Sequence, residues 1–147
     1  MTKVLIAEDE LMIADMAEEV LVENGYEVCG IARTVGEAID IGRRHHPDLA
    51  LIDLRLAYGG FGTDVANELT ALGRIGVLYA SGNVAQVKQR ATTGEACLAK
   101  PFRSQDLLRG LEIVNEIVTS GRASPPFPPG FSLLPSPLPV AQDADLG

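Results

Sequence analysis

Acidic and polar residues stand directly after apolar runs at four places in the chain, and they are the residues best suited to chemistry. The first run, 3–7, leads into Glu8-Asp9-Glu10, and the run 49–52 leads into Asp53. Two later apolar runs end at Ser81 and at Lys100. If these run ends meet in space, they form a pocket of carboxylates with one hydroxyl and one ammonium group.

The composition of such a pocket indicates phosphoryl chemistry. Carboxylates a few ångströms apart repel each other and protonate unless a positive charge compensates them. Mg²⁺ does so with oxygen ligands, using one or two carboxylates together with water and substrate oxygens. The ammonium group of Lys100 and the hydroxyl of Ser81 suit phosphate oxygens. An aspartate at the centre can then act as a nucleophile that forms an acyl phosphate.

The elements that would position these residues alternate along the chain. Short, nearly continuous apolar runs are typical of strands buried on both faces, and longer amphipathic runs are typical of helices. The strands are expected at 3–7, 26–32, 49–53, 75–80 and 96–99, and the helices at 10–24, 34–46, 63–72, 84–91 and 104–119. This alternation predicts a parallel sheet covered on both faces, with its functional crevice at the carboxyl ends of the strands.

Helix boundaries and buried faces can also be predicted. Thr34 with Glu37 reads as a capping box, and Ser104 as the N-cap of the last helix. The cap of the helix at 63–72 is assigned to Thr63 or Asp64. In the first helix, the apolar spacing predicts an inward face of Met12, Ile13, Met16, Ala17 and Val20.

The overall composition excludes several classes of protein. The chain has 147 residues, 46% of them hydrophobic, and a net charge of −8. This acidity argues against binding to nucleic acid or to an anionic membrane, because both need a basic face. Two cysteines, Cys29 and Cys97, are too few for a disulfide framework or a cysteine-based zinc site. Without a targeting signal or a membrane span in the sequence, the expected location is the cytoplasm.

The amino-acid composition of the chain changes after Gly121. Seven of the nine prolines fall in the remaining segment. Residues 1–121 are therefore expected to form the domain, and residues 122–147 a proline-rich, extended or disordered tail. That tail is too short and too low in charge to serve as a DNA-binding domain.

Four sequence runs, VLIAEDE, PDLALID, VLYASG and LAKPF, resemble the receiver domain of bacterial two-component response regulators. They occur in the family's order over residues 2 to about 120. The resemblance implies a flavodoxin-like (βα)5 fold with strand order 2-1-3-4-5. It also implies a protein that is no conventional enzyme, since it catalyses only its own phosphotransfer and slow dephosphorylation.

The resemblance assigns the acidic residues as follows. Asp53 corresponds to the phosphoacceptor and is a ligand of the Mg²⁺ cofactor. Asp9 is a direct metal ligand, and Glu8 acts through water. The backbone carbonyl of Arg55 completes the metal site on this reading.

The remaining assignments concern the residues that handle the phosphoryl group. Ser81 corresponds to the switch hydroxyl and Lys100 to the phosphoryl-binding lysine, with the Lys100-Pro101 peptide bond held cis. Arg55 and Asn83 occupy the positions that flank the attacking water, where the guanidinium group is expected to shield the phosphoryl group.

The chain also departs from the family pattern. Ala57 replaces a common proline within an unusual loop, AYGGFGT, and Cys97 replaces the switch aromatic. A signal is therefore expected to pass through residues 81–96 more than through an aromatic rotation. The run Tyr79-Ala80-Ser81-Gly82 is similar to stand-alone receivers that work with HWE-type or related histidine kinases.

The favoured function is thus a stand-alone phosphoacceptor that receives a phosphoryl group from a histidine kinase or a phosphotransfer protein and signals through protein partners. The alternative is a degenerate receiver that acts as a phosphorylation-independent interaction module. A flavodoxin-like or phosphatase enzyme is disfavoured, because the chain lacks a flavin phosphate loop and a DxDxT run.

Overall fold

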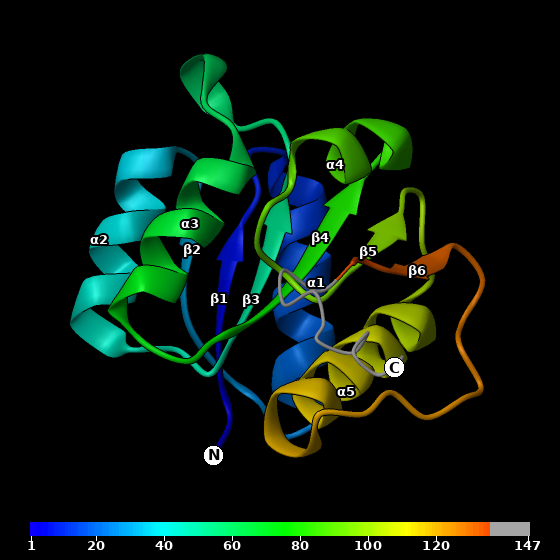
Figure 1. Ribbon diagram of the computed structural model, residues 1–147. Helices are drawn as coiled ribbons and strands as arrows, with labels where there is room; N and C mark the ends of the chain where they lie inside the picture. The colour runs from blue at the N-terminus through cyan, green and yellow to red at the C-terminus, as the bar shows by residue number, and fades with distance from the viewer. Residues whose placement is uncertain (136–147) are drawn as a thin grey trace.

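The computed structural model describes residues 1–135, which form a sheet sandwiched between two layers of helices (Figure 1). The elements alternate along the chain: β1 (Lys3–Ala7), α1 (Leu11–Glu23), β2 (Glu27–Ala32), α2 (Val35–His45), β3 (Leu49–Asp53), the 3-10 turn η1 (Ala57–Gly59), α3 (Gly62–Leu72), β4 (Gly76–Ser81), α4 (Val84–Arg90), β5 (Ala96–Ala99), α5 (Ser104–Ser120) and β6 (Phe131–Leu133). Within residues 1–135, no helix has the length and apolarity needed to cross a membrane.

The sheet has the order β2-β1-β3-β4-β5-β6. The first five strands are parallel, so the predicted flavodoxin-like topology 2-1-3-4-5 is confirmed. The sixth strand, which the sequence patterns did not predict, pairs antiparallel with β5.

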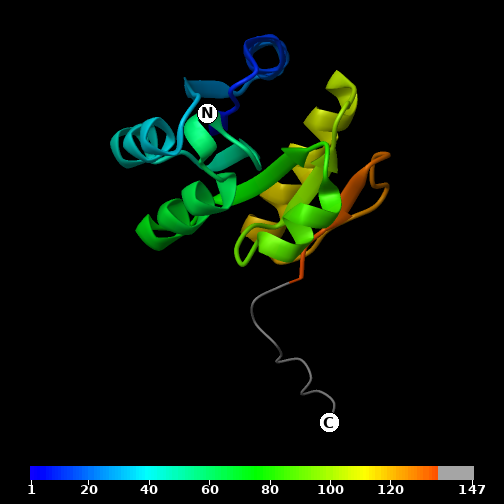
Figure 2. The same cartoon turned by 90° about the horizontal axis from the view of Figure 1, so that it is seen from above.

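Alternating residues of the strands face two separate cores, as expected where successive side chains point to opposite faces. One core contains Leu5, Ile52 and Tyr79. The other contains Ile6, Leu51 and Leu78. Figure 2 shows α1 and α5 on one face of the sheet and α2, α3 and α4 on the other. Burial on both faces explains why the central strands read as continuous apolar runs.

Of the three predicted helix N-caps, the structure confirms one and contradicts two. Thr34 caps α2, because its hydroxyl accepts a hydrogen bond from the backbone of Glu37 at 3.1 Å. The predicted cap at Ser104 is wrong: Arg103 is the N-cap of α5, and Ser104 already lies in the first turn. For α3, the predicted cap at Thr63 or Asp64 is also wrong, since the helix begins at Gly62 and both residues lie inside it.

The inward face of α1 also differs from the prediction. Its buried residues are Ala14, Ala17 and Leu21, whereas Met12 is 87% exposed. Small alanines face the sheet because they let the helix approach it closely, and the longer Ile13, Met16 and Val20 lie at the margins of this face.

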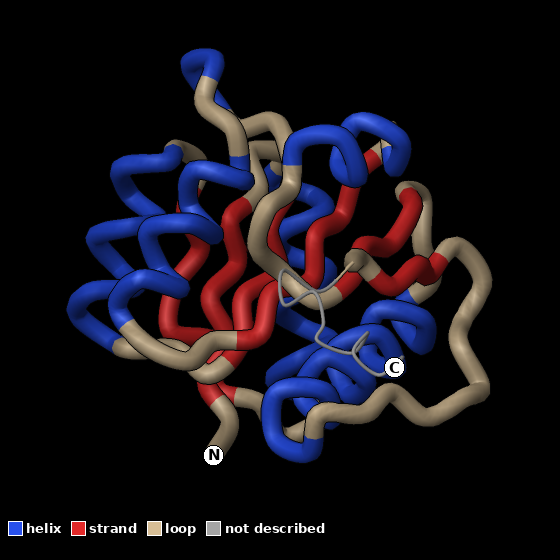
Figure 3. The backbone as a smooth tube through the Cα atoms, viewed as in Figure 1, coloured by secondary structure: helices blue, strands red, loops and turns tan. Residues whose placement is uncertain are grey.

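The segment after Gly121 is partly built into the domain. It leaves α5, runs outside the helix in the long loop seen in Figure 3, and returns as β6. Within the described residues, this segment is therefore extended, as expected, but it also contains a strand that pairs with the sheet. The part of the predicted tail at 136–147 lies outside the described residues.

Candidate functional site

The predicted pocket lies at the carboxyl ends of the parallel strands, at the top of Figure 1. The ammonium group of Lys100 lies 2.8 Å from Glu8 Oε1, 3.2 Å from Asp53 Oδ2 and 3.4 Å from Glu10 Oε1. These contacts join residues up to 92 positions apart in the chain, because β1 and β3 are neighbours in the sheet and β4 alone separates β3 from β5. The strand order thus converts separate run ends into one charged cluster.

Glu8 is the most deeply buried carboxylate of the cluster, with 5% of its side chain exposed. Burial raises the pKa of Glu8 from its ordinary 4.5 to about 7, and the neighbouring Asp53 charge adds to this. The hydrogen bonds from Lys100 and from the backbone of Glu10 act in the opposite direction and do not cancel the effect. Desolvation is therefore the main reason that the protonated form of Glu8 is favoured, and the contact with Lys100 offsets it only in part.

Lys100 has the complementary environment. Burial alone would lower the pKa of its ammonium group, but the hydrogen bond with Glu8 and the charges of Asp53 and Glu8 outweigh it and raise the pKa. The lysine therefore remains a cation aimed at Asp53. Its peptide bond to Pro101 is cis, as the resemblance implied.

Asp53 ends β3 and is followed by a tight backbone loop, which carries the AYGGFGT stretch. The amide of Leu56 donates to the carbonyl of Gly60 at 2.9 Å, and the amide of Gly62 donates to Leu54 at 2.7 Å. A side chain at Gly62 would collide with the backbone carbonyl of Asp53 and with Ile52. Glycine at this position therefore allows α3 to begin against the phosphoacceptor candidate.

Ser81 ends β4 and is buried beside the start of α4. Its hydroxyl accepts a hydrogen bond from the amide of Asn83 at 3.0 Å, and its carbonyl accepts one from the amide of Lys100 at 2.9 Å. The side chain of Asn83 caps α4 by accepting from the amide of Gln86 at 3.0 Å. A movement of the Ser81 hydroxyl would therefore disturb the first turn of α4 directly.

Arg55 points to α4 in this structure, where it donates to Gln86 Oε1 at 3.2 Å. Its guanidinium group also lies 5.4 Å from the centre of the Phe61 ring, and Arg90 stacks on the same ring at 3.6 Å. The expected shielding of a phosphoryl group on Asp53 therefore requires Arg55 to leave Gln86. For Asn83, the expected contact with water competes with its role as a helix cap.

The structure brings together other residues of the first acidic run than the predicted metal site does. Oxygen atoms of Glu8, Glu10 and Asp53 lie within 4.8 Å of one another, and Asp9, the predicted direct ligand, is not in this group. Glu10 was not assigned a role from the sequence. The signal was available, since the chain is extended at Glu10 and side chains two positions apart then point the same way.

Cys97 replaces an aromatic residue of the family pattern, and its neighbour Tyr79 is the largest fully buried side chain of the described residues. The two residues pair across β4 and β5. The Tyr79 hydroxyl donates to the carbonyl of Thr93 at 2.9 Å. This aromatic ring is therefore buried and hydrogen-bonded in the core, and the expected route of the signal through residues 81–96 stays a prediction.

The donor set fits a hard divalent cation. Three carboxylates offer oxygen ligands within a small volume, and their charge exceeds that of Lys100. Mg²⁺ prefers oxygen ligands of this kind and retains several waters. Of the residues brought together, Asp53, Glu8 and Glu10 would hold such an ion.

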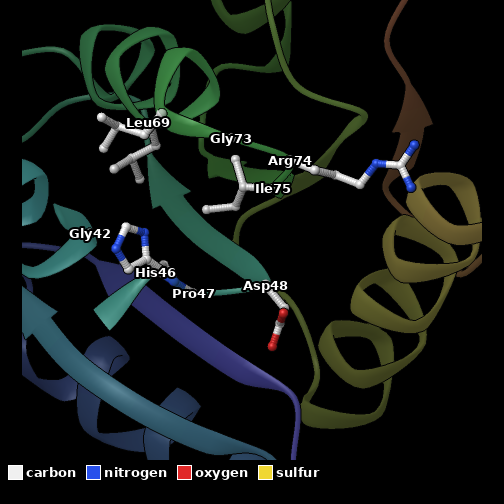
Figure 4. A pocket seen from close by; sticks show the side chains of 9 residues that line it. Gly42, His46, Pro47, Asp48, Leu69, Gly73, Arg74 and Ile75 are labelled. Atoms are coloured by element: carbon white, nitrogen blue, oxygen red, sulfur yellow. The ribbon is translucent and has the colours of Figure 1, made fainter. Parts of the chain in front are cut away.

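A cavity of about 200 Å³ lies at the opposite end of the sheet, before β3 and β4. In Figure 4, His46, Leu69 and Ile75 point toward one another there, whereas Arg74 and Asp48 point away. No set of polar groups converges in this cavity. The chemistry of the described residues is therefore concentrated at the carboxyl ends of the strands.

Comparison with known proteins agrees with this geometry. Residues 4–112 match the family described as the response regulator receiver domain. The chain is 36% identical over 114 residues to the transcriptional regulatory protein PdtaR of Mycobacterium tuberculosis, covering 76% of this chain and 55% of PdtaR. It is 38% identical over 109 residues to the phyllosphere-induced regulator PhyR of Methylorubrum extorquens, covering 69% of this chain and 39% of PhyR.

The chain thus spans about half or less of the length of these curated relatives. Among solved structures, it superimposes on a CheY-like receiver domain protein from Methanospirillum hungatei with a TM-score of 0.71 and 24% identity, covering 83% of this chain and 99% of that one. This last similarity concerns the fold alone.

Proposed function

Because this chain belongs to the response regulator receiver domain family of two-component signalling, we propose that it accepts a phosphoryl group on Asp53. The single observation that carries the proposal is the contact of Lys100 with both Asp53 and Glu8 at the carboxyl ends of the strands. A carboxylate held beside a fixed cation and further oxygen ligands is suited to become an acyl phosphate.

In the proposed reaction, an oxygen of the Asp53 carboxylate attacks the phosphorus of a phosphohistidine. The new O–P bond forms as the N–P bond breaks, and the donor imidazole leaves with the bonding electron pair and takes up a proton. Lys100, already 3.2 Å from Asp53 Oδ2, donates to a phosphoryl oxygen. When bound, Mg²⁺ supplies charge compensation for the phosphoryl oxygens.

The proposed switch begins at Ser81. Its hydroxyl, which accepts from the amide of Asn83, turns to donate its hydrogen to a phosphoryl oxygen, and this movement weakens the contact with Asn83, whose side chain caps α4. With Tyr79 fixed in the core, the change passes through the β4–α4 connection.

The receiver assignment implies a histidine kinase as the general partner. We propose the finer assignments on the sequence alone: a kinase of the HWE type or a phosphotransfer protein as donor, a protein partner for output, and a cytoplasmic location. The stand-alone architecture stays a prediction.

Labelling with acetyl phosphate in the presence of Mg²⁺ tests the proposal. The wild-type chain should incorporate phosphate, and Asp53→Asn should abolish incorporation because the amide cannot form the acyl phosphate. Asp64→Asn, a change at an exposed aspartate of α3, is the matched control and should label normally.

Full labelling of Asp53→Asn would reassign the phosphoacceptor. Absence of label in a folded wild-type chain that binds Mg²⁺ would favour the alternative function, a phosphorylation-independent interaction module. That alternative draws support from the replacement of the family's switch aromatic by Cys97.

A further inference from the structure

Residues 122–135, here called the strap, cover one edge of the sheet. Figure 2 shows the strap at the outer side of β5, at the opposite end of the sheet from β2. Its strand β6 pairs antiparallel with β5, with Leu98 opposite Phe131 and Ala96 opposite Leu133. Backbone hydrogen bonds of 2.9 Å flank this ladder, from Ala99 to Gly130 and from Leu134 to Glu95.

Two side chains of the strap pack against the buried core, Leu134 on one face of the sheet and Phe131 on the other. Phe131 is the one next to α5. Its ring joins the core that contains Leu78 and Leu98. Gly110 of α5 provides the space: a Cβ atom there would lie 3.2 Å from Leu78 Cδ2 and 3.6 Å from the Phe131 ring. The Phe127 ring covers Phe131 from outside, with ring centres 5.5 Å apart.

The side chain of Arg109 holds the strap by binding backbone carbonyls of the strap. The guanidinium group donates to the carbonyl of Ser124 at 2.6 Å and to that of Pro126 at 3.1 Å. The amide of Ser124 in turn donates to Glu116 Oε1 at 3.0 Å. On the strap, these contacts involve backbone groups alone. Helix α5 can therefore hold an extended peptide of varied sequence in the same way.

The attachment of the strap is nevertheless limited. β6 has three residues, and Phe127 and Leu133 are 42% and 43% exposed. Four of the five residues at 125–129 are prolines, which have no amide to donate to a neighbouring strand. A segment with few buried contacts opens at low free-energy cost. Opening would leave the backbone of β5 as an unpaired edge, the kind of surface that accepts a further strand.

From these contacts we infer that the β5 edge and the adjoining face of α5 form a docking surface for an extended peptide strand of a protein partner, which the strap occupies in cis. The partner segment pairs antiparallel with β5, places an aromatic side chain against Gly110 and presents backbone carbonyls to Arg109. The strap shows the chemistry of that ligand, and it excludes the partner until it is displaced. The inference is independent of phosphorylation at Asp53.

A labelled peptide with the sequence of residues 122–135 tests the inference on the full chain. Ser132→Pro removes the backbone donor from the central residue of β6 and leaves the docking surface unchanged. The peptide should bind the Ser132→Pro chain at least about tenfold more tightly than the wild-type chain, because a tethered strap competes at an effective concentration on the order of mM. Amide exchange at residues 96–99 reports whether the edge has opened, and Phe131→Ala in the full chain is a second way to open it.

Two controls address specificity. A peptide that itself carries Ser132→Pro should not bind, and adding Arg109→Ala to the opened chain should weaken binding of the original peptide. If residues 96–99 exchange freely in an opened chain and the peptide does not bind, the inference is overturned. Continued protection of these residues in both variants would also overturn it, because the strap would then be permanent. A wild-type dimer that Ser132→Pro abolishes would assign the surface to a second copy of the chain.

Discussion

Neutralising Glu8 should change how the stability of the metal-free protein depends on pH. Burial raises the pKa of Glu8 from 4.5 to about 7, so the folded state binds this proton more tightly than the unfolded state. The free energy of unfolding therefore falls as pH rises through this window, and the loss is complete above pH 7. At about 1.4 kcal/mol for each pH unit of displacement, the full effect is about 3 kcal/mol.

The variant Glu8→Gln removes the titrating group and keeps the side-chain size. Between pH 5 and pH 8, the wild-type chain should lose about 2–3 kcal/mol more stability than the variant does. Urea denaturation in the presence of a chelator measures both free energies. Glu8→Gln also weakens the contact with Lys100, and part of this loss does not depend on pH. Comparing how the stability of each protein changes with pH cancels that constant part.

Mg²⁺ provides the second arm of this test. A bound cation favours the ionised form of Glu8, so saturating Mg²⁺ should reduce the pH dependence assigned to this residue. Glu95 is the matched control, since burial also raises its pKa while its carboxylate accepts from the amide of Val77. Its contribution should not respond to Mg²⁺. If the wild-type and Glu8→Gln curves stay parallel within about 0.5 kcal/mol, the reasoning about Glu8 is refuted.

Three further predictions concern the elements around Asp53. Gly62→Ala should destabilise the protein by about 1–3 kcal/mol in urea denaturation and slow labelling by acetyl phosphate, because the new methyl group meets the backbone carbonyl of Asp53. The control Gly36→Ala, where space is open, should be neutral or stabilise the protein by up to about 1 kcal/mol. Equal effects of the two substitutions would contradict the steric argument. In excess Mg²⁺, Arg55→Ala should release phosphate faster than wild type, whereas Gln86→Ala, which frees the guanidinium group, should release it more slowly; the reverse order would mean that Arg55 assists hydrolysis. Amide exchange on phosphorylation should change mainly in residues 81–96, and changes confined to the loop after Asp53 would exclude the proposed route through α4.

Some features of this protein follow from the sequence alone because their physical causes are local. Continuous apolar runs predict strands buried on both faces, and the acidic or polar residue after each run falls at the carboxyl end of a strand. The cap at Thr34 depends on a hydrogen bond to a residue three positions away, so local chemistry is sufficient there. The meeting of Asp53 and Lys100 in one pocket is not local: it needs the sheet order, which the family resemblance supplied and the structure confirms.

Other features depend on contacts that no local pattern encodes. Arg55 meets Gln86 across 31 residues, and the two lie together only because β3 and β4 are adjacent in the sheet. Whether Asp9 or Glu10 joins Glu8 depends on the direction in which the chain turns into α1. The prolines around residues 131–134 conceal a short apolar run, and its pairing becomes favourable only when β5 offers an open edge and Gly110 leaves room for Phe131. Tertiary structure decided these points, because the free energy that determines them comes from partners distant in the chain.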